Sequence, residues 1–331
     1  MNLKILNKLK APTGEITWSA PSNLALVKYW GKDNRNNPIN PSLSFSLKKS
    51  TATTRLKWKA GTGSVSFFLD KQLKPSFYPK IEQFIKRLKK NGLTILKEID
   101  LEIYSNNTFP HSTGIASSAS GFSSLSLAIL SMFQSKEDDH FWKLASYIAS
   151  LGSGSAARST YPGYVSWNGG AAKKVKTSSL FSDLQDAILI VDSSPKENSS
   201  SYGHELMKQH PFKKTRIAWA SHNFLKLKKI LQGTDFYSFA KLVEQEALIL
   251  HALMMTSSPP LIYMKPNSLK VINIIRKLMN DCPITYTLDA GANIHLLYPK
   301  TFDIDSVIRS LKGLLVKIIY DEVGNGPQLL R

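Results

Sequence analysis

Hydrophobic and polar residues alternate through much of the first third of the chain. This period of two is typical of β-strands, and the segments that show it are residues 15–20, 42–47, 51–59, 64–70 and 100–105. The segment between the last two of these strands has a different pattern, because Ile81, Phe84, Ile85 and Leu88 recur at the spacing of a single helix face. We therefore expect an amphipathic helix over residues 79–91, which ends at Gly92.

Helical spacing dominates the rest of the chain. The predicted helices are residues 116–134, 139–150, most of 204–256, 268–280 and 304–314; the predicted strands are 186–192, a strand–turn–strand over 284–298, and 315–321. Strands followed by helices predict an α+β fold and not a regular β-α alternation. Because no flexible linker marks the change of pattern, we expect two lobes in firm contact, residues 1–185 and 186–331, with a cleft between them.

The composition is that of an ordinary globular protein, with 42% apolar and 20% charged residues among 331. No apolar run reaches the roughly 18 residues that a membrane span requires, and the first residues lack the apolar block of a secretory signal. The only cysteine, Cys282, excludes an intramolecular disulfide and a cysteine-rich metal site. We expect a cytoplasmic protein that makes no membrane contact.

The net charge of +19 allows three interpretations: binding to nucleic acid, to an anionic membrane surface, or to small polyanionic substrates. Bidentate phosphate recognition favours arginine, but the chain has 8 arginines against 35 lysines, spread from end to end. We therefore expect a lysine-rich solvated surface that also attracts phosphorylated substrates. A nucleic-acid-binding protein remains a remote alternative.

Residues 107–121, NTFPHSTGIASSASG, combine a bend with a helix start. The segment follows a predicted strand, turns at Pro110 and Gly114, and enters a helix of small residues. Unpaired N–H groups and the helix dipole favour an anion at such a start, where Ser117 and Ser118 add hydroxyls for phosphate or Mg²⁺. It is not a Walker A loop, since no Gly-Lys-Ser/Thr follows the glycine. A capped helix with closely packed small residues is the structural alternative.

Residues 152–163, GSGSAARSTYPG, place one arginine among small residues. Arg158 is the only arginine between Arg87 and Arg216 in a lysine-rich chain. This favours a bidentate contact with a carboxylate or phosphate. A surface arginine in a turn explains the pattern equally well.

Two further charged residues adjoin apolar strand patterns. Lys28 follows Leu26 and Val27, so alternation could turn it inward, where it would need an acid or an anionic ligand; an edge-strand lysine reaching water is the alternative. Asp289 ends the apolar segment 284–288 and precedes Ala-Gly-Ala-Asn. It could act as a general base or cap the turn.

Taken together, the segments resemble those of the diphosphomevalonate decarboxylases of the GHMP kinase superfamily. The matching segments are SNLALVKYWGK, TFPHSTGIASSASG, GSGSAARSTYPG and TYTLDAGAN, with SPKENSSSYG, TSSPPLIYM and VGNGPQ as further matches. The resemblance extends from about residue 16 to residue 328. KYWGK and Gly-Ser-Gly-Ser-x-x-Arg are specific to the decarboxylases, whereas the serine-rich loop is shared with the kinases.

The resemblance implies a GHMP kinase-like α+β fold in two lobes, the first like ribosomal protein S5 domain 2 and the second ferredoxin-like, with the active site between them. It implies that ATP, with Mg²⁺, phosphorylates the 3-hydroxyl of mevalonate 5-diphosphate. The new phosphate then leaves as CO₂ is lost, which gives isopentenyl diphosphate. We expect a homodimer. A phosphomevalonate decarboxylase and a mevalonate-type kinase remain alternatives, although such kinases lack the aspartate–lysine pair.

The resemblance also implies roles for individual residues. Asp289 matches the catalytic aspartate, Lys28 the lysine that holds it ionised, and Arg158 the arginine that grips the substrate carboxylate. The implied substrate-binding residues are Tyr29, Lys32, Ser153, Ser155 and Ser200. The implied ATP-binding residues are Asn107, Pro110, Gly114, Ala116, Ser117 and Ser118, of which Ser118 also lies near the metal. Two departures from the family pattern are His204, where Met is common, and Ala292, where Pro is usual.

Overall fold

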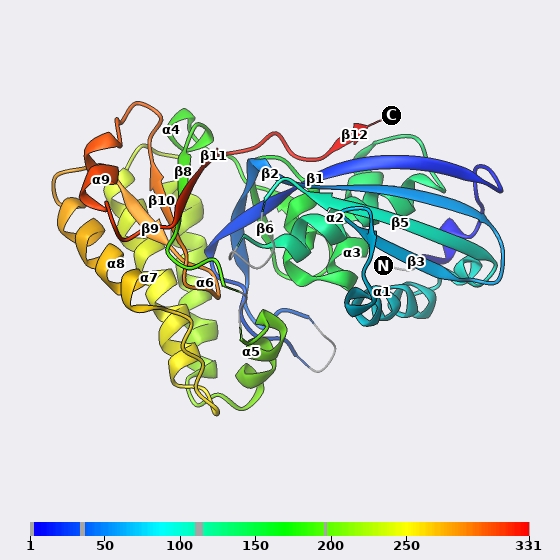
Figure 1. Cartoon of the computed structure of the whole chain (residues 1–331), viewed down its shortest axis with the longest axis horizontal. Helices are drawn as coiled ribbons and strands as arrows, with labels where there is room; N and C mark the ends of the chain where they lie inside the picture. The colour runs from blue at the N-terminus through cyan, green and yellow to red at the C-terminus, as the bar shows by residue number, and fades with distance from the viewer. Residues whose placement is uncertain (1–2, 34–36, 110–114, 195–196, 331) are drawn as a thin grey trace.

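The structure is a computed structural model that describes residues 3–33, 37–109, 115–194 and 197–330. Two lobes lie side by side along the longest axis of the molecule (Figure 1). Each lobe contains its own β-sheet. Within these ranges no helix is long and apolar enough to cross a membrane.

The first lobe is built on a mixed sheet with the strand order β12-β1-β2-β5-β3-β4, and β6 and β7 extend it from β2. Its strands are β1 (Gly14–Val27), β2 (Ser42–Ala60), β3 (Val65–Leu69), β4 (Gln72–Leu73), β5 (Ile99–Asn107), β6 (Tyr164–Trp167), β7 (Lys173–Lys174) and β12 (Gln328–Leu330). β3 and β5 pair in parallel, and the other pairs are antiparallel.

Three helices cover one face of this sheet (Figure 1). They are α1 (Tyr78–Lys90), α2 (Ser117–Ser131) and α3 (Asp139–Gly152), and the short helices of the lobe are η1 (Leu3–Leu6), η2 (Pro75–Phe77), η3 (Thr94–Lys97), η4 (Gly154–Thr160) and α4 (Ser179–Ser182). α2 lies deepest, because its small side chains allow close approach to the strands. Most of its buried serines are hydrogen-bonded; Ser124 Oγ, for example, lies 2.6 Å from Thr54 Oγ1, whereas Ser123 Oγ has no partner among the described residues. Polar residues are thereby accommodated in the core.

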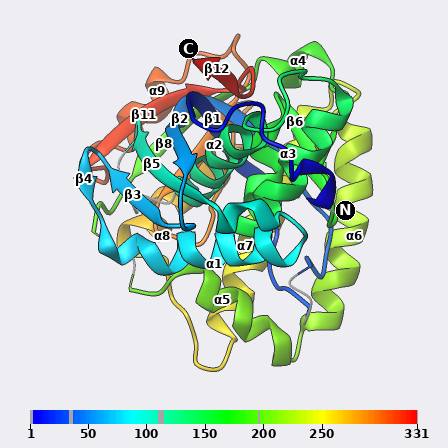
Figure 2. The same ribbon diagram turned by 90° about the vertical axis from the view of Figure 1, so that its right-hand side faces the viewer.

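The second lobe is built on an antiparallel sheet with the order β11-β8-β10-β9. Its strands are β8 (Gln185–Ile190), β9 (Thr285–Thr287), β10 (Ile294–Tyr298) and β11 (Lys317–Glu322). Its helices are α5 (Ser200–Leu206), η5 (Met207–Gln209), α6 (Lys213–Ile230), α7 (Phe236–Met255), α8 (Pro266–Leu278) and α9 (Asp305–Ser310). α6 runs along the outer edge of the molecule (Figure 2).

The long strand β2 differs most from the expected pattern. Residues 42–47 and 51–59 were expected as two strands, but they form one continuous strand. Exposed Lys48 and Lys49 interrupt the alternation without ending the strand, because the ladder to β1 continues on both sides of them. The predicted helix 304–314 is only Asp305–Ser310, and the short strand β6 was not predicted.

The lobes are joined by more than the chain that links them. The carboxylate of Asp321, in β11, accepts hydrogen bonds from the N–H groups of Lys48, Lys49 and Ser50, each at 2.8 Å. After β11 the chain returns to the first lobe, where β12 pairs with β1. The end of the segment expected to form the second lobe thus lies on the first sheet.

Candidate active site

Lys28 and Asp289 meet where the two lobes join. Lys28 directly follows β1, and Asp289 lies between β9 and β10. The Nζ–Oδ1 distance is 2.8 Å, and the exposed fractions of the two side chains are 1% and 24%. Nζ also donates to the carbonyl of Ala25 at 2.7 Å. Of the two directions that the sequence left open for Lys28, the structure therefore shows the inward one, and the alternative of an edge-strand lysine in water is wrong.

The charge of Lys28 depends on its neighbours. Burial lowers the pKa of Lys28, and the charge and hydrogen bond of Asp289 act in the opposite direction. Glu246 also favours the charged form, whereas Arg158 disfavours it. Because burial penalises an ammonium group strongly, Lys28 stays protonated mainly through the acidic groups beside it.

Arg158 is buried inside η4, with 2% of its surface exposed. Its guanidinium donates to Ser44 Oγ at 2.8 Å, to Ser42 Oγ at 2.6 Å and to Asn23 Oδ1 at 3.2 Å. The alternative of a surface arginine in a turn is wrong. Burial lowers the pKa of Arg158 to about 10, an effect that nearby Asp289 opposes.

The contacts of Arg158 leave part of its guanidinium for a ligand. Its partners Asn23, Ser42 and Ser44 are neutral, and across the described ranges no carboxylate lies within ion-pair distance of it. The bonds engage three of the five N–H groups of an arginine. A buried cation without an acidic partner is costly unless an anion binds it. Arg158 is therefore suited to an anionic ligand.

The start of α2 faces a group of serine hydroxyls from another part of the lobe. Ser118 Oγ lies 3.5 Å from Ser153 Oγ, which lies 3.2 Å from Ser155 Oγ. Ala116 occupies the N-cap position, no side chain caps the helix, and its first turn has no acidic residue. The close packing of small residues that the structural alternative expects is present, but no cap from the side chain of Ala116 occupies the helix start among the described residues, so this start can receive an anion.

Tyr29 carries a buried hydroxyl that lacks a protein partner. The residue is 9% exposed, and its Oη has no hydrogen-bond partner in the part of the chain that the structure describes. Its ring contacts Trp167 and His204, with centroid distances of 5.2 Å and 4.5 Å. An unsatisfied buried hydroxyl costs about 1–3 kcal/mol, so Oη marks a place for a polar ligand atom.

His204 ties α5 to the segment that carries Tyr29 and Lys32. The N–H of Gly31 donates to His204 Nδ1 at 2.9 Å, and the imidazole ring also lies 4.6 Å from the ring of Trp30. Burial lowers the pKa of His204 to about 3, in agreement with a ring nitrogen that accepts a hydrogen bond. Burial likewise lowers the pKa of Lys32.

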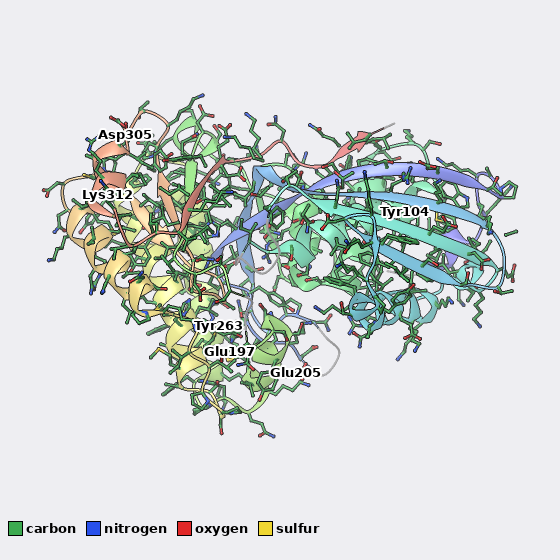
Figure 3. All side chains as sticks on the ribbon, viewed as in Figure 1. Tyr104, Glu197, Glu205, Tyr263, Asp305 and Lys312 are labelled. Carbon is green, nitrogen blue, oxygen red and sulfur yellow. The ribbon has the colours of Figure 1, made fainter. Side chains whose placement is uncertain are left out.

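Ser200 is the first residue of α5, which Ser199 caps through the N–H of Tyr202. The segment before α5 is attached to the second lobe, because Tyr263 Oη donates to the carbonyl of Asn198 at 3.2 Å. Figure 3 shows Tyr263 and Glu197 close to this helix, which itself carries Glu205. The residues just before Ser200 are therefore held against the second lobe.

Of the remaining expected nucleotide-binding positions, Asn107, Pro110 and Gly114, the structure describes only Asn107. Asn107 is the last residue of β5 and pairs with Ala52 of β2. Pro110 and Gly114 lie outside the described residues. The structure thus places Ala116, Ser117 and Ser118 at the helix start and Asn107 at the strand end before it.

Two protein-family models cover most of the chain. The diphosphomevalonate decarboxylase-like N-terminal domain matches residues 20–180, and the mevalonate 5-diphosphate decarboxylase C-terminal domain matches residues 187–318. The diphosphomevalonate decarboxylase of Eremothecium gossypii is 30% identical over an alignment of 306 residues that covers 85% of this chain and 76% of that protein. The chain belongs to the diphosphomevalonate decarboxylase family.

Solved structures of the family share the fold. Mevalonate diphosphate decarboxylase from Staphylococcus aureus superposes with a TM-score of 0.85 at 24% identity, over 96% of this chain and 98% of that one. MDDEF in complex with MVAPP, AMPPCP and magnesium gives a TM-score of 0.85 at 23% identity, over 96% and 99%. The predicted GHMP kinase-like α+β fold in two lobes is confirmed.

Several residues around the site were not predicted from the sequence. Asn23, Ser42 and Ser44 surround Arg158, and Arg216 with Glu246 contacts Lys28. A signal for the serines existed, because SLSFSL places hydroxyls at every second position of a strand. No local pattern identifies Arg216 and Glu246, which lie in two different helices.

A nucleotide with Mg²⁺ fits the start of α2. The helix start is uncapped, and the exposed Ser118 presents a hydroxyl. No group of three or more His, Cys, Asp or Glu side chains that could hold a metal occurs among the described residues. Mg²⁺ needs none, since it commonly takes phosphate oxygens and water with only one or two protein oxygens.

Proposed function

We propose that this protein catalyses the ATP-dependent decarboxylation of mevalonate 5-diphosphate to isopentenyl diphosphate, with release of ADP, phosphate and CO₂. The observation that carries the proposal is the buried Lys28–Asp289 pair at 2.8 Å, close to Arg158, in a member of this family. The pair would act in phosphoryl transfer, so the release of CO₂ is what separates this proposal from a kinase that stops after phosphorylation.

The reaction requires a good leaving group at C3. Transfer of the γ-phosphoryl group of ATP to the C3 oxygen replaces a poor leaving group, hydroxide, by phosphate. The C1–C2 bond then breaks, its electron pair forms the C2–C3 double bond, and the C3–O bond breaks as phosphate leaves. Asp289 accepts the hydroxyl proton or orients the hydroxyl, and Lys28 stabilises charge on the transferring phosphoryl group.

Arg158 binds the carboxylate that is lost as CO₂. Its two remaining N–H groups can form a two-pronged contact with that carboxylate, while Asn23, Ser42 and Ser44 orient the guanidinium. Ser153 and Ser155 lie at the same end of the substrate. Because the carboxylate must become neutral CO₂, Arg158 acts mainly in binding and orientation.

The diphosphate of the substrate lies against Tyr29, Lys32 and Ser200. The unpartnered Oη of Tyr29 donates to a phosphate oxygen. Lys32 supplies a positive charge. Burial lowers the pKa of Lys32, and binding of the anionic diphosphate raises that pKa again. Burial raises the pKa of Tyr29, so that its hydroxyl keeps its proton and remains a donor.

ATP binds at the start of α2, through Ala116, Ser117 and Ser118 together with Asn107, Pro110 and Gly114. Ser118 Oγ and the ATP phosphates would hold Mg²⁺, which would neutralise charge on the phosphates. The solved complex of MDDEF with AMPPCP and magnesium supports this assignment. The lack of a side-chain cap on α2 supports it from this chain alone.

One assay tests the proposal. Incubation with ATP, Mg²⁺ and mevalonate 5-diphosphate should release ADP and CO₂ in equal amounts. ADP without CO₂ would identify a kinase, and neither product would contradict the proposal. Mevalonate 5-phosphate serves as the matched substrate, because faster CO₂ release from it would favour the phosphomevalonate decarboxylase alternative.

We also propose a cytoplasmic homodimer whose lobes divide near residue 185. β8 begins at Gln185, and the two family models match on either side of that position, which supports the division. Trp219 and Leu225 are 49% and 68% exposed on α6, at the outer edge in Figure 2, which supports contact with a second copy. Sedimentation of the purified protein would distinguish a dimer from a monomer.

A further inference from the structure

We propose that the buried pair of Arg216 and Glu246 is a positioning device that holds the backbone of Lys28 and thereby places its ammonium group at Asp289. The inference rests on the proposed function, since it assigns Arg216 and Glu246 to the support of a residue in the proposed reaction. Neither side chain is expected to touch substrate or nucleotide.

The pair itself is a two-pronged contact between helices of the second lobe. Arg216 lies on α6 and Glu246 on α7, and both side chains are 0% exposed. Nη1 donates to Oε1 and Nη2 to Oε2, both at 3.0 Å. Asn223 Nδ2 donates to Oε1 at 2.8 Å, which fixes the carboxylate from a further side. Buried ion pairs add little net stability because both ions lose water, so stability alone explains the pair poorly.

The pair contacts both backbone groups of Lys28. The N–H of Lys28 donates to Glu246 Oε2 at 3.0 Å, and Arg216 Nη2 donates to the carbonyl of Lys28 at 2.6 Å. Asn40 Nδ2 donates to the same carbonyl at 2.9 Å. The ladder between β1 and β2 ends at Val27, so at the next residue side chains take the place of strand pairing.

This arrangement explains how Lys28 is held near the junction of two lobes. Lys28 belongs to the first lobe, whereas Arg216, Glu246 and Asp289 belong to the second. The same lobe therefore fixes the backbone of the lysine and supplies the carboxylate that receives its side chain. A displacement of about 1 Å in such a pair can lower turnover about 100-fold. Fixing the backbone protects the Nζ–Oδ1 contact from such displacement.

The pair also affects the protonation of Lys28. The charged groups that face this lysine are Asp289 and Glu246, which favour its ammonium form, and Arg158, which disfavours it; Arg216 contacts its carbonyl. Removal of the charge of Glu246 leaves two arginines and one carboxylate around Lys28. The pKa of Lys28 then falls further, so the alkaline limb of the activity profile moves to lower pH.

Kinetics of three variants test the inference. Glu246→Gln should lower kcat at least tenfold with substrate KM within threefold, and should shift the alkaline limb of kcat to lower pH. The double variant Arg216→Gln/Glu246→Gln leaves no unpaired buried charge, so it should fold better than Glu246→Gln while kcat remains at least tenfold low. Glu244→Gln is the matched control: Glu244 lies on the same helix and contacts Arg276 at 2.9 Å and Tyr286 Oη at 3.1 Å, and it is not among the charged groups that act on Lys28. It should keep wild-type kcat per folded molecule and the wild-type pH profile.

A purely structural role gives a different result. Variants at 216 and 246 whose kcat per folded molecule and pH profile match those of wild type would overturn the inference, as would an equal loss in Glu244→Gln. If wild type releases no CO₂, the proposed function fails on its own. The crystal structure of Arg216→Lys then decides the inference, because an Nζ–Oδ1 distance still near that of wild type contradicts positioning and a distance beyond 4 Å supports it.

Discussion

Two charged side chains at this site are buried, although the free energy of their charged forms would be lower in water. Lys28 and Arg158 are 1% and 2% exposed, and burial lowers the pKa of each. The contact with Asp289 offsets part of the free-energy cost of burying the Lys28 ammonium group. The guanidinium of Arg158 has only neutral oxygen atoms as partners until an anion binds. The two cations are therefore arranged for a negatively charged ligand.

Asp289→Asn tests the role of the carboxylate. The variant keeps the shape of the side chain but removes its charge, so turnover should fall by about 10³-fold or more, the usual loss when a base and an electrostatic contribution disappear together. Affinities for ATP and mevalonate 5-diphosphate, measured by calorimetry, should stay near those of wild type. Lys28→Met should behave similarly. Retention of most of the activity in Asp289→Asn would contradict the assignment.

His204→Met tests the protonation of a partly buried imidazole. The pKa of His204 is about 3 in the folded protein and about 6.5 in an unfolded chain, so the unfolded state binds more protons between these values. His204 therefore lowers stability as pH falls from 6.5 towards 3. When the pH is lowered from 7 to 5, the free energy of unfolding of His204→Met should therefore rise by about 2 kcal/mol relative to that of wild type. Urea unfolding at both pH values measures it, and a pH-independent difference would refute it.

Secondary-structure elements bring these side chains together mainly through their ends. β1 ends just before Lys28, α2 starts at Ser117, and η4 carries Arg158. Small residues at these ends leave room for neighbours and ligands. A Cβ at Gly154, at the start of η4, would lie 2.7 Å from the ring of Tyr29.

Gly154→Ala tests this packing. The added methyl group should displace the Tyr29 ring and raise KM for mevalonate 5-diphosphate about tenfold, while KM for ATP changes little, because a misplaced ring removes about one charge-assisted hydrogen bond. Gly121→Ala on α2 is the control, since outside its own helix no described residue lies within 4 Å of the position of its Cβ. An equal effect of the two substitutions on KM would show that Tyr29 is not involved.

In the whole molecule, the relative position of the lobes depends on contacts between segments far apart in the chain. Asp321 of β11 accepts hydrogen bonds from three consecutive N–H groups of β2, and β12 returns to pair with β1. Such contacts keep the lobes from moving freely, which the Lys28–Asp289 distance requires.

Asp321→Asn tests the junction. An amide in place of the carboxylate cannot accept from all three N–H groups, so the free energy of unfolding should fall by about 2–3 kcal/mol, as measured by urea denaturation. Asp303→Asn is the control, because Asp303 accepts only within an exposed turn, from the N–H of Asp305 at 3.0 Å, and should cost less than about 1 kcal/mol. Similar losses in both variants would argue against a special role for the junction.

Local pattern in the sequence was sufficient for most elements and for the segments that carry the chemistry. The helix predicted over residues 79–91 is α1, Tyr78–Lys90, because burial of one face imposes the 3.6-residue period on the sequence itself. The start of α2 was recognisable from its small residues. The family segments supplied the candidates Lys28, Arg158 and Asp289, whose roles remain proposals.

Tertiary structure decided what those residues touch. Lys28 and Asp289 are 261 positions apart, and alternation alone left Lys28 either inside or at an edge. The partners of Arg158 and the Arg216–Glu246 pair come from separate strands and helices, so no periodicity connects them. A sequence pattern reports which face of an element is buried, whereas the partner of a buried charge depends on how the elements pack.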